Sequence, residues 1–340
     1  MRYRSLGSTG IQVSEYCLGA MMYGEWGNPD HDDAIRQIHK ALDTGINFVD
    51  VADVYSRGEA EEIVGKALKG RRDDIVLATK VHGVMGDDPN QRGNSRRWIM
   101  KEVEASLRRL DTDWIDLYQI HRPDYTCDIE ETLSALSDLI HQGKVRAIGS
   151  STFPADQIVE AQWAAERRNL ERFRCEQPPY SLFVRGIETA VLPACERYGM
   201  GVIVWSPLAA GWLTGRYRRP EDVDLESGRA ARFPFRFDPE LPANQRKFEI
   251  VEELIKVAAD AGTTLTHLAI AFVLSHRAVT SVILGPRTAE QLDDLLAGVD
   301  VRLDAEILDR LDELCPPGSD VGEDGSYQLP WLTDASLRRR

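Results

Sequence analysis

Four side chains that can bind or release a proton follow three short apolar runs of this 340-residue sequence. Asp50 ends the first run, and Tyr55 follows five residues later. Lys80 follows the second run, and His121 follows the third. The runs read as buried strands and cover residues 46–49, 75–79 and 114–120. Because α/β proteins assemble active sites at the carboxyl ends of parallel strands, we expect these groups to meet in a site for proton transfer.

Each of the four residues also has an ordinary structural explanation. An aspartate after a strand often caps a turn or helix, and a tyrosine often packs in a core. A lysine usually reaches solvent, and a histidine in a loop often serves as a hydrogen-bonded support. The repetition at three successive strand ends is what favours a shared site over four separate explanations.

Strand-like and helix-like segments alternate about eight times along the chain, with short connections between them. This alternation predicts a parallel sheet, and eight units predict a closed (β/α)8 TIM barrel of the α/β class. We expect one barrel domain over residues 1–315 and a C-terminal tail over 316–340. Caps and apolar stripes predict helices over Asp32–Leu42, Ala60–Leu68, Ser95–Leu110, Ile129–His141, Asp156–Arg167, Ile187–Tyr198, Arg246–Ala259 and Thr266–Leu274.

Three segments do not fit the alternation. Arg2–Tyr16 reads as a hairpin that turns at Ser8–Gly10. The long segment 215–243 is rich in Arg, Phe and Pro, and it reads either as a functional loop or as an edge strand. In the tail, four apolar residues could fold back over the barrel mouth: Tyr327, Leu329, Trp331 and Leu332.

Composition narrows the class of protein. The apolar fraction of 43% supports a large core, and no run approaches about eighteen uninterrupted apolar residues, so we expect no membrane span. A net charge of −14 argues against a nucleic-acid partner. The first residues lack the apolar region of a secretory signal. The five scattered cysteines lack a CxxC pair, which favours free thiols in the cytoplasm and predicts no metal site.

Three blocks resemble the signature blocks of the aldo-keto reductase superfamily: GINFVDVADVY at 45–55, LATKV at 77–81 and DLYQIHRPD at 116–124. The resemblance runs from about Tyr3 to about Leu314 and is nearest to the branch that holds bacterial aryl-alcohol and sugar reductases and potassium-channel β-subunits. It implies a barrel closed at its bottom by the N-terminal hairpin. It also implies reduction of an aldehyde or ketone with NADPH, which becomes NADP+.

The resemblance implies a role for each of the four residues. Tyr55 would donate a proton to the carbonyl oxygen, and the Lys80 ammonium would make that phenol a better donor. Asp50 would hold Lys80 in place. His121 would orient the carbonyl and stabilise developing negative charge.

The chain has neither the GxGxxG sequence of a Rossmann site nor a P-loop sequence. The resemblance instead implies the cofactor site that is typical of the family. Thr152 and Asp294 stand where the family often has asparagine, so contacts there are expected to differ. Arg287 would bind the 2′-phosphate of NADPH, or else pair with Glu290 or Asp294. The residues expected to bind cofactor are Gly19, Ala20, Met21, Asp50, Ser151, Thr152, Gln177, Trp205, Ser206, Pro207, Leu208, Gly211, Leu213, Arg216, Gly285, Arg287, Gln291 and Asp294.

The substrate is expected to be a small carbonyl compound, and a homo-oligomer is compatible with the sequence. An aromatic pocket is predicted from Tyr23, Trp26, His82, Trp212 and Phe233. Two other functions remain open. The chain could be a cofactor-binding regulatory module of the channel β-subunit type with little turnover. Alternatively, Lys80 could form a Schiff base, as in aldolases.

Overall fold

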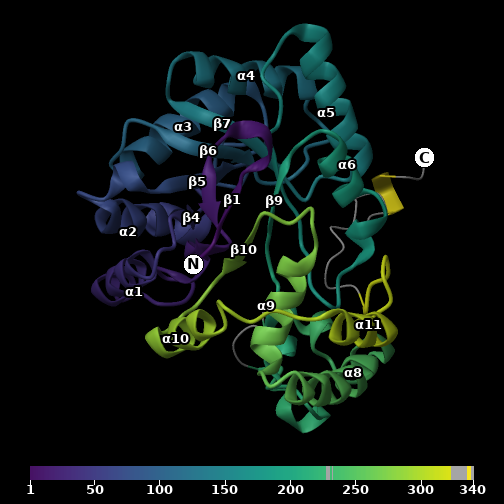
Figure 1. The fold of residues 1–340 in the computed structure, drawn as a ribbon. Coiled ribbons are helices and arrows are strands. Elements are labelled where there is room, and N and C mark those ends of the chain that lie inside the picture. Colours follow the sequence, from purple (N-terminus) through teal and green to yellow (C-terminus); the bar gives the residue numbers. More distant parts are fainter. Residues whose placement is uncertain (227–229, 232, 323–334, 338–340) are drawn as a thin grey trace.

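Eight parallel strands close into a barrel surrounded by helices in the computed structural model of the chain (Figure 1). The structure describes residues 1–226, 230–231, 233–322 and 335–337. Strand order around the barrel follows the chain, and the last strand pairs with the first. The strands are β3 (Tyr16–Gly19), β4 (Phe48–Asp50), β5 (Val76–Val81), β6 (Ile115–Ile120), β7 (Val145–Ser151), β8 (Cys175–Gln177), β9 (Gly201–Val204) and β10 (Ser281–Leu284). The predicted TIM barrel is confirmed.

Side-chain caps mark where many of the helices begin. Asp30, Ser95 and Thr288 each accept a hydrogen bond from a backbone N–H two or three residues into the helix that follows. The main helices are α1 (His31–Asp43), α2 (Glu59–Leu68), α3 (Arg96–Leu110), α4 (Ile129–His141), α5 (Ala155–Arg168), α6 (Val191–Arg197), α8 (Pro242–Asp260), α9 (Leu265–Ser275), α10 (Ala289–Ala297) and α11 (Ala305–Leu314).

One predicted helix is wrong in its extent. The expected helix Ile187–Tyr198 is divided into a 3-10 turn, Gly186–Thr189, and helix α6. Pro193 explains the break, because a proline deep in a helix clashes with the carbonyl four residues earlier and is tolerated in the first turn. Helix α6 therefore begins only two residues before Pro193.

The N-terminal hairpin closes the amino end of the barrel. Strands β1 (Tyr3–Ser5) and β2 (Gln12–Ser14) pair antiparallel, and the hairpin is drawn in purple in Figure 1. A Cβ on Gly7 would lie 2.4 Å from the backbone nitrogen of Gly201, the first residue of β9. Because Gly7 also has a φ of +53°, glycine suits this close contact.

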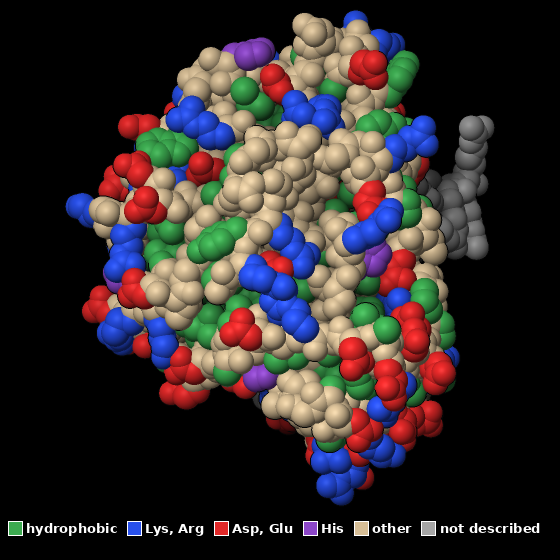
Figure 2. All heavy atoms as spheres, viewed as in Figure 1, with side chains coloured by type: hydrophobic (Ala, Val, Ile, Leu, Met, Phe, Trp, Pro, Cys, Tyr) green, Lys and Arg blue, Asp and Glu red, His purple; other side chains and the backbone are tan. Residues whose placement is uncertain are grey.

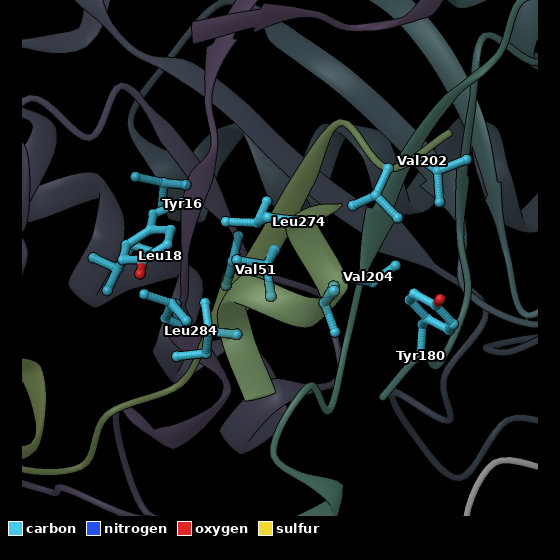
Figure 3. Packing of buried hydrophobic residues seen from close by; sticks show 14 of the residues in the cluster. Tyr16, Leu18, Val51, Tyr180, Val202, Val204, Leu274 and Leu284 are labelled. Carbon is cyan, nitrogen blue, oxygen red and sulfur yellow. The ribbon is translucent and has the colours of Figure 1, made fainter. Parts of the chain in front are cut away.

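The apolar core forms two layers. An inner layer fills the lower barrel, where Leu6 and Val13 of the hairpin region pack with side chains from the strands. An outer layer lies between the strands and the helices. Figure 3 shows part of that layer around Leu18, Val204 and Leu274, which come from β3, β9 and α9.

Up to residue 241, the described part of the long segment 215–243 is mainly loop, and helix α8 begins at Pro242. It contains 3-10 turns at Pro220–Asp222 and Pro234–Arg236, and the described part holds no strand, so the edge-strand interpretation is wrong there. At the start of the tail, Asp320 accepts hydrogen bonds from the backbone N–H groups of Arg185 and Gly186. The four tail residues expected over the mouth lie outside the described residues.

No single helix in the described part of the chain is both long and apolar enough to cross a membrane. Helices α8 and α9 meet at 86° and satisfy the length and composition requirements only as a pair. On the face shown in Figure 2, acidic and basic side chains are interspersed around the rim.

Candidate functional site

Every second side chain of each strand points into the barrel, and the last inward-facing residues form a polar layer above the inner apolar layer. Side chains alternate between the barrel interior and the surrounding helices. The inner apolar layer contains, in strand order, Cys17, Phe48, Ala78, Leu117, Ala147, Cys175 and Ile203. Two residues further along the same strands stand Gly19, Asp50, Lys80, Gln119, Gly149, Gln177 and Trp205. Five of the predicted site residues thus share the carboxyl end of the barrel interior: Gly19, Asp50, Lys80, Gln177 and Trp205.

Lys80 lies between the carboxylate and the phenol. Its Nζ is 2.6 Å from Asp50 Oδ2 and 3.3 Å from Tyr55 Oη, and it also donates to the Val51 carbonyl at 2.8 Å. Burial lowers the pKa of Lys80, but Asp50 and Tyr55 outweigh this effect and hold it above its usual value. Lys80 is therefore an ammonium ion at neutral pH, with all three of its donors used.

Tyr55 is held by a loop with unusual backbone geometry. Ser56 and Arg57 directly after it have φ values of +46° and +56°, which is uncommon outside glycine. The Ser56 hydroxyl fixes the turn because it donates to the Tyr23 carbonyl at 3.1 Å and accepts from the Trp26 N–H at 3.1 Å. The Trp26 ring lies 6.1 Å from the Tyr55 ring.

His121 completes the group of four. Its ring meets that of Tyr55 edge to face, with centroids 5.6 Å apart and an angle of 82°. Burial, followed by the positive charges of Arg122 and Lys80, lowers the pKa of His121 well below its usual value. The imidazole is therefore neutral near pH 7 and can offer one N–H to a ligand.

A buried ionic network lies behind the Tyr55 loop. Arg109 of α3 donates to Glu61 of α2 at 2.6 Å and to Glu102 at 2.5 Å. Glu61 also accepts from the Thr79 hydroxyl on β5 at 2.6 Å. Burial, then the charges of Glu61 and Glu102, raise the pKa of Asp53 well above its usual value. This network joins α2, α3 and β5 beside the segment that carries Tyr55.

The residues expected around the nicotinamide carboxamide are together at the ends of β7 and β8. Ser151 Oγ donates to the Gln177 carbonyl at 2.9 Å, and the Gln177 amide donates to Asp50 Oδ1 at 2.8 Å. Thr152 has a φ of +61°, a conformation that asparagine adopts more readily than threonine. Gln177 therefore links the expected cofactor contacts to the Asp50 carboxylate.

The loop after β9 also has strained backbone. Ser206, Ala209 and Ala210 have φ values of +59°, +46° and +61°, and such residues cluster at ligand sites. Trp205 is half-buried at the start of this loop, with the Arg122 guanidinium 5.7 Å from its ring. Arg216 at the far end is exposed and lies over the Tyr217 ring at 4.9 Å.

The expected adenosine-phosphate residues lie at the start of α10. The Arg287 N–H donates to the Gln291 side chain at 2.9 Å, and the Arg287 carbonyl accepts from Gln37 at 3.3 Å. The Arg287 side chain is exposed and has no ion-pair partner among the described residues, so the alternative pairing with Glu290 or Asp294 is absent there. Asp294 lies instead 3.3 Å from His267 Nε2.

The structure corrects two of the predicted pocket residues. Tyr23 and Trp212 are both 0% exposed, so neither lines an open pocket. Tyr23 packs in the outer core layer. Trp212 is turned inward by the strained loop, donates to the Arg236 carbonyl and packs on Phe248.

The remaining predicted pocket residues are partly exposed. Trp26 contacts the Tyr55 ring, as described above, and His82 Nδ1 lies 2.9 Å from Asn94 Oδ1. Phe233 lies under the Arg236 guanidinium, 5.4 Å from it.

Sequence reasoning missed three residues at the site. Gln119 donates to Asp50 at 3.3 Å, and its place two residues before His121 on an inward-facing strand could have revealed it. Arg122 donates to Thr152 Oγ1 at 3.1 Å and to the His121 carbonyl at 2.6 Å. Glu176, on the outer face of β8, is fully buried beneath the Ser151 and Thr152 turn.

Known proteins are similar in sequence to this chain over nearly its whole length. The model of the Aldo/keto reductase family matches residues 15–315. An "Uncharacterized oxidoreductase YrpG" of Bacillus subtilis (strain 168) is 39% identical over 335 residues, which cover 95% of this chain and 99% of the relative. "Aldo-keto reductase YhdN" of the same organism is 36% identical over 300 residues, covering 87% of this chain and 88% of the relative.

Relatives with a different description match equally far along the chain. A "Probable voltage-gated potassium channel subunit beta" of Arabidopsis thaliana is 37% identical over 331 residues, which cover 92% of this chain and 96% of the relative. The family match spans all eight strands of the barrel and the polar layer at their carboxyl ends. This chain therefore belongs to the aldo/keto reductase family.

Proposed function

We propose that this oxidoreductase reduces an aldehyde or ketone to an alcohol by hydride transfer from NADPH, with Tyr55 as the proton donor. The observation that carries the proposal is the position of Lys80 Nζ, 2.6 Å from Asp50 and 3.3 Å from Tyr55 Oη. A buried ammonium next to a phenol favours negative charge on the phenol oxygen, which forms as the proton leaves. His121, at the edge of the same ring, supplies the neutral donor that a carbonyl oxygen requires.

The residues present suit a nicotinamide dinucleotide. Arg216 and Arg287 are exposed cations in a chain with a net charge of −14. Arg287 precedes a helix whose first N–H groups favour a phosphate. The residues with positive φ at Thr152, Ser206 and Ala210 lie in the loops that follow β7 and β9 at the carboxyl end of the barrel. Bound NADPH would supply the hydride.

The protein's own groups would perform the rest of the reaction. His121 would donate its N–H to the carbonyl oxygen and hold the carbonyl carbon toward the hydride donor. As negative charge develops, Tyr55 would transfer its proton to that oxygen. Lys80 would stabilise the resulting phenolate, and Asp50 would hold Lys80 in place through the ion pair at 2.6 Å. Gln177 and Gln119 would fix the orientation of Asp50.

NADPH oxidation measured across a panel of aldehydes, ketones and keto-sugars tests the proposal. Turnover that requires both NADPH and a carbonyl compound, with the matching alcohol as product, is the expected result. A protein that binds NADPH but oxidises it with no carbonyl compound of the panel would contradict a reductase. That outcome would favour a regulatory module, which the relatives described as channel subunits make the second candidate.

An aldolase-like function for Lys80 is disfavoured by its surroundings. A Schiff base requires the neutral amine, whereas Asp50 and Tyr55 hold Lys80 protonated. Borohydride would be expected to trap no substrate on Lys80 in the absence of NADPH. Trapping under those conditions would overturn the reductase proposal.

We also propose that the protein works in the cytoplasm. All five cysteines are free thiols in the structure, and four of them are buried. Reduced thiols are the usual state in that compartment. Fractionation of the cells that produce the protein would test this, and recovery outside the cytoplasm would contradict it.

A further inference from the structure

Glu176 is a buried carboxyl group that the proposed chemistry does not use. It lies on the outer face of β8, one residue before Gln177, and is 0% exposed. Its two oxygens point to the neighbouring strand and loop: Oε2 accepts from the Ser150 hydroxyl at 2.5 Å, and Oε1 accepts from the Phe153 N–H at 3.1 Å. The Thr152 N–H lies beside the same carboxyl group and donates to the Gln177 carbonyl at 3.1 Å.

These contacts enclose the turn from Ser150 to Phe153. Residues Ser151 and Thr152 inside the turn project to the expected carboxamide site, and Thr152 has its strained φ of +61° there. Strained backbone persists only where its surroundings determine it. Glu176 accepts hydrogen bonds from Ser150 before Thr152 and from Phe153 after it, and these contacts can hold the strained turn in place.

We propose that Glu176 is a positioning residue for the cofactor: its ionised carboxyl group holds the Ser150–Phe153 turn in the form that binds the nicotinamide end. The inference rests on the proposed function, because it assumes that a dinucleotide binds at Ser151 and Thr152. It goes further by making cofactor binding depend on the ionisation of a residue that does not touch the cofactor.

The groups around Glu176 make this ionisation sensitive to pH near neutrality. Burial raises the pKa of Glu176 to about 7, against the opposing effects of Ser150, the two N–H groups and Arg122. Arg122 reaches it from the loop after β6, and Cys195 faces it from α6. Burial raises the pKa of both Cys195 and the neighbouring Cys175, so these thiols are neutral. Arg122 is thus the charged group that acts on Glu176 among the described residues.

Protonation would weaken the turn because it removes one acceptor. A protonated carboxyl group carries its proton on one oxygen, whereas the Ser150 hydroxyl and the Phe153 N–H each donate to a different oxygen of Glu176. Hydrogen bonds to a charged group are also stronger than those to a neutral one. The turn is therefore best held when Glu176 is ionised.

The test compares NADPH binding by wild type and Glu176→Gln from about pH 5.5 to pH 8.5, by quenching of protein fluorescence. The cofactor's own 2′-phosphate also titrates in this range, so the ratio of the two Kd values at each pH isolates the protein's contribution. We expect the variant to bind about as well as wild type at the acid end. At the alkaline end it should bind about fivefold to tenfold more weakly, as the replacement of one charged hydrogen bond by a neutral one implies.

Two further variants sharpen the result. Glu15→Gln removes a buried carboxyl group at the opposite end of the barrel, where it pairs with Arg2 and Arg4, and its Kd ratio should not change with pH. Ser150→Ala removes one donor to Glu176 and should move the midpoint of the pH dependence to higher pH. If Glu176→Gln fails to fold, this shift still tests the inference.

The outcomes separate the inference from the function on which it rests. A wild-type protein that binds no dinucleotide at any pH would contradict the proposed function and this inference with it. Wild-type binding with a Kd ratio that stays constant with pH would overturn the role of Glu176 alone. A constant loss at every pH would show that Glu176 is merely structural.

Discussion

At the residue scale, the site depends on charges that are buried with their partners. Lys80 is 0% exposed and keeps its proton because Asp50 and Tyr55 surround its ammonium group. His121, whose ring meets that of Tyr55 edge to face, is kept neutral by burial and by nearby positive charge. The same strand ends therefore hold one group charged and the other neutral near pH 7. A charged Lys80 can assist proton donation by the neighbouring Tyr55, and a neutral His121 can donate a hydrogen bond to a carbonyl oxygen.

Lys80→Met should reduce kcat as strongly as loss of the phenol itself. The substitution removes the charge that stabilises the Tyr55 oxygen as its proton leaves, and it leaves Asp50 buried without its partner. The pH–rate profile of carbonyl reduction measures the coupling, because the limb that reports the proton donor should move. A pH–rate profile with the same apparent pKa values as wild type and only a lower maximal rate would contradict an effect of Lys80 on Tyr55.

Glu176→Gln should change the pH dependence of stability in a defined direction. The pKa of Glu176 is raised from 4.5 to about 7 in the fold, so its contribution to stability is full below pH 4.5 and is lost as the pH rises to about 7. This loss is about 3 kcal/mol, and the variant lacks it. Urea unfolding of both proteins across this range measures it. Parallel stability curves would mean that Glu176 has the same pKa in the folded and the unfolded protein.

Arg287→Ala should weaken NADPH binding and leave NADH binding nearly unchanged. A guanidinium that engages a 2′-phosphate through one or two charged hydrogen bonds contributes about 1.5–3 kcal/mol for each. The expected loss is therefore at least about tenfold for NADPH, and about a thousandfold if two bonds of about 2 kcal/mol are lost. Fluorescence titration with both cofactors measures it. Equal losses for both cofactors, or none for either, would leave Arg287 without a role in selectivity.

At the element scale, loops rather than strands hold the difficult geometry. The strands place Asp50, Lys80 and Gln177 by simple alternation, and the pattern of the sequence predicted each strand. The left-handed residue Thr152 directly follows β7, and Ser56 lies in the 3-10 turn Tyr55–Gly58 after β4. The carboxyl group of Glu176 supports the first turn, and the network around Arg109 lies behind the second. Apolar periodicity carries no information on such turns, so sequence reasoning placed the side chains but missed their supports.

Arg109→Met should destabilise the fold by about 3–5 kcal/mol, because it leaves two buried carboxylates without their cation. Glu61 and Glu102 are 0% and 3% exposed. Arg277→Met is the matched control, since Arg277 pairs with Glu196 on the surface with 84% of its side chain exposed and should matter little. Urea unfolding compares the two variants. Similar stabilities would show that the network behind Tyr55 does not stabilise the fold.

At the scale of the whole molecule, the barrel was predictable and the lining of its mouth was not. Eight alternating units and the apolar runs at 46–49, 75–79 and 114–120 sufficed to predict the fold and the meeting of the four catalytic candidates. Tyr23 and Trp212 were expected at the mouth because aromatic residues in loops there often line pockets. Their burial follows from how the loops turn at Ser56 and Ala210, which depends on contacts between segments far apart in the sequence.

The Tyr55→Phe variant tests the central claim most directly, through single-turnover oxidation of bound NADPH by a carbonyl substrate that wild type reduces. The substitution removes the proton donor and little packing, so cofactor affinity and the unfolding midpoint should stay near those of wild type. The rate of NADPH oxidation should fall by about a hundredfold or more, the scale of general acid catalysis. A variant that binds NADPH and oxidises it at close to the wild-type rate would show that Tyr55 is not the proton donor.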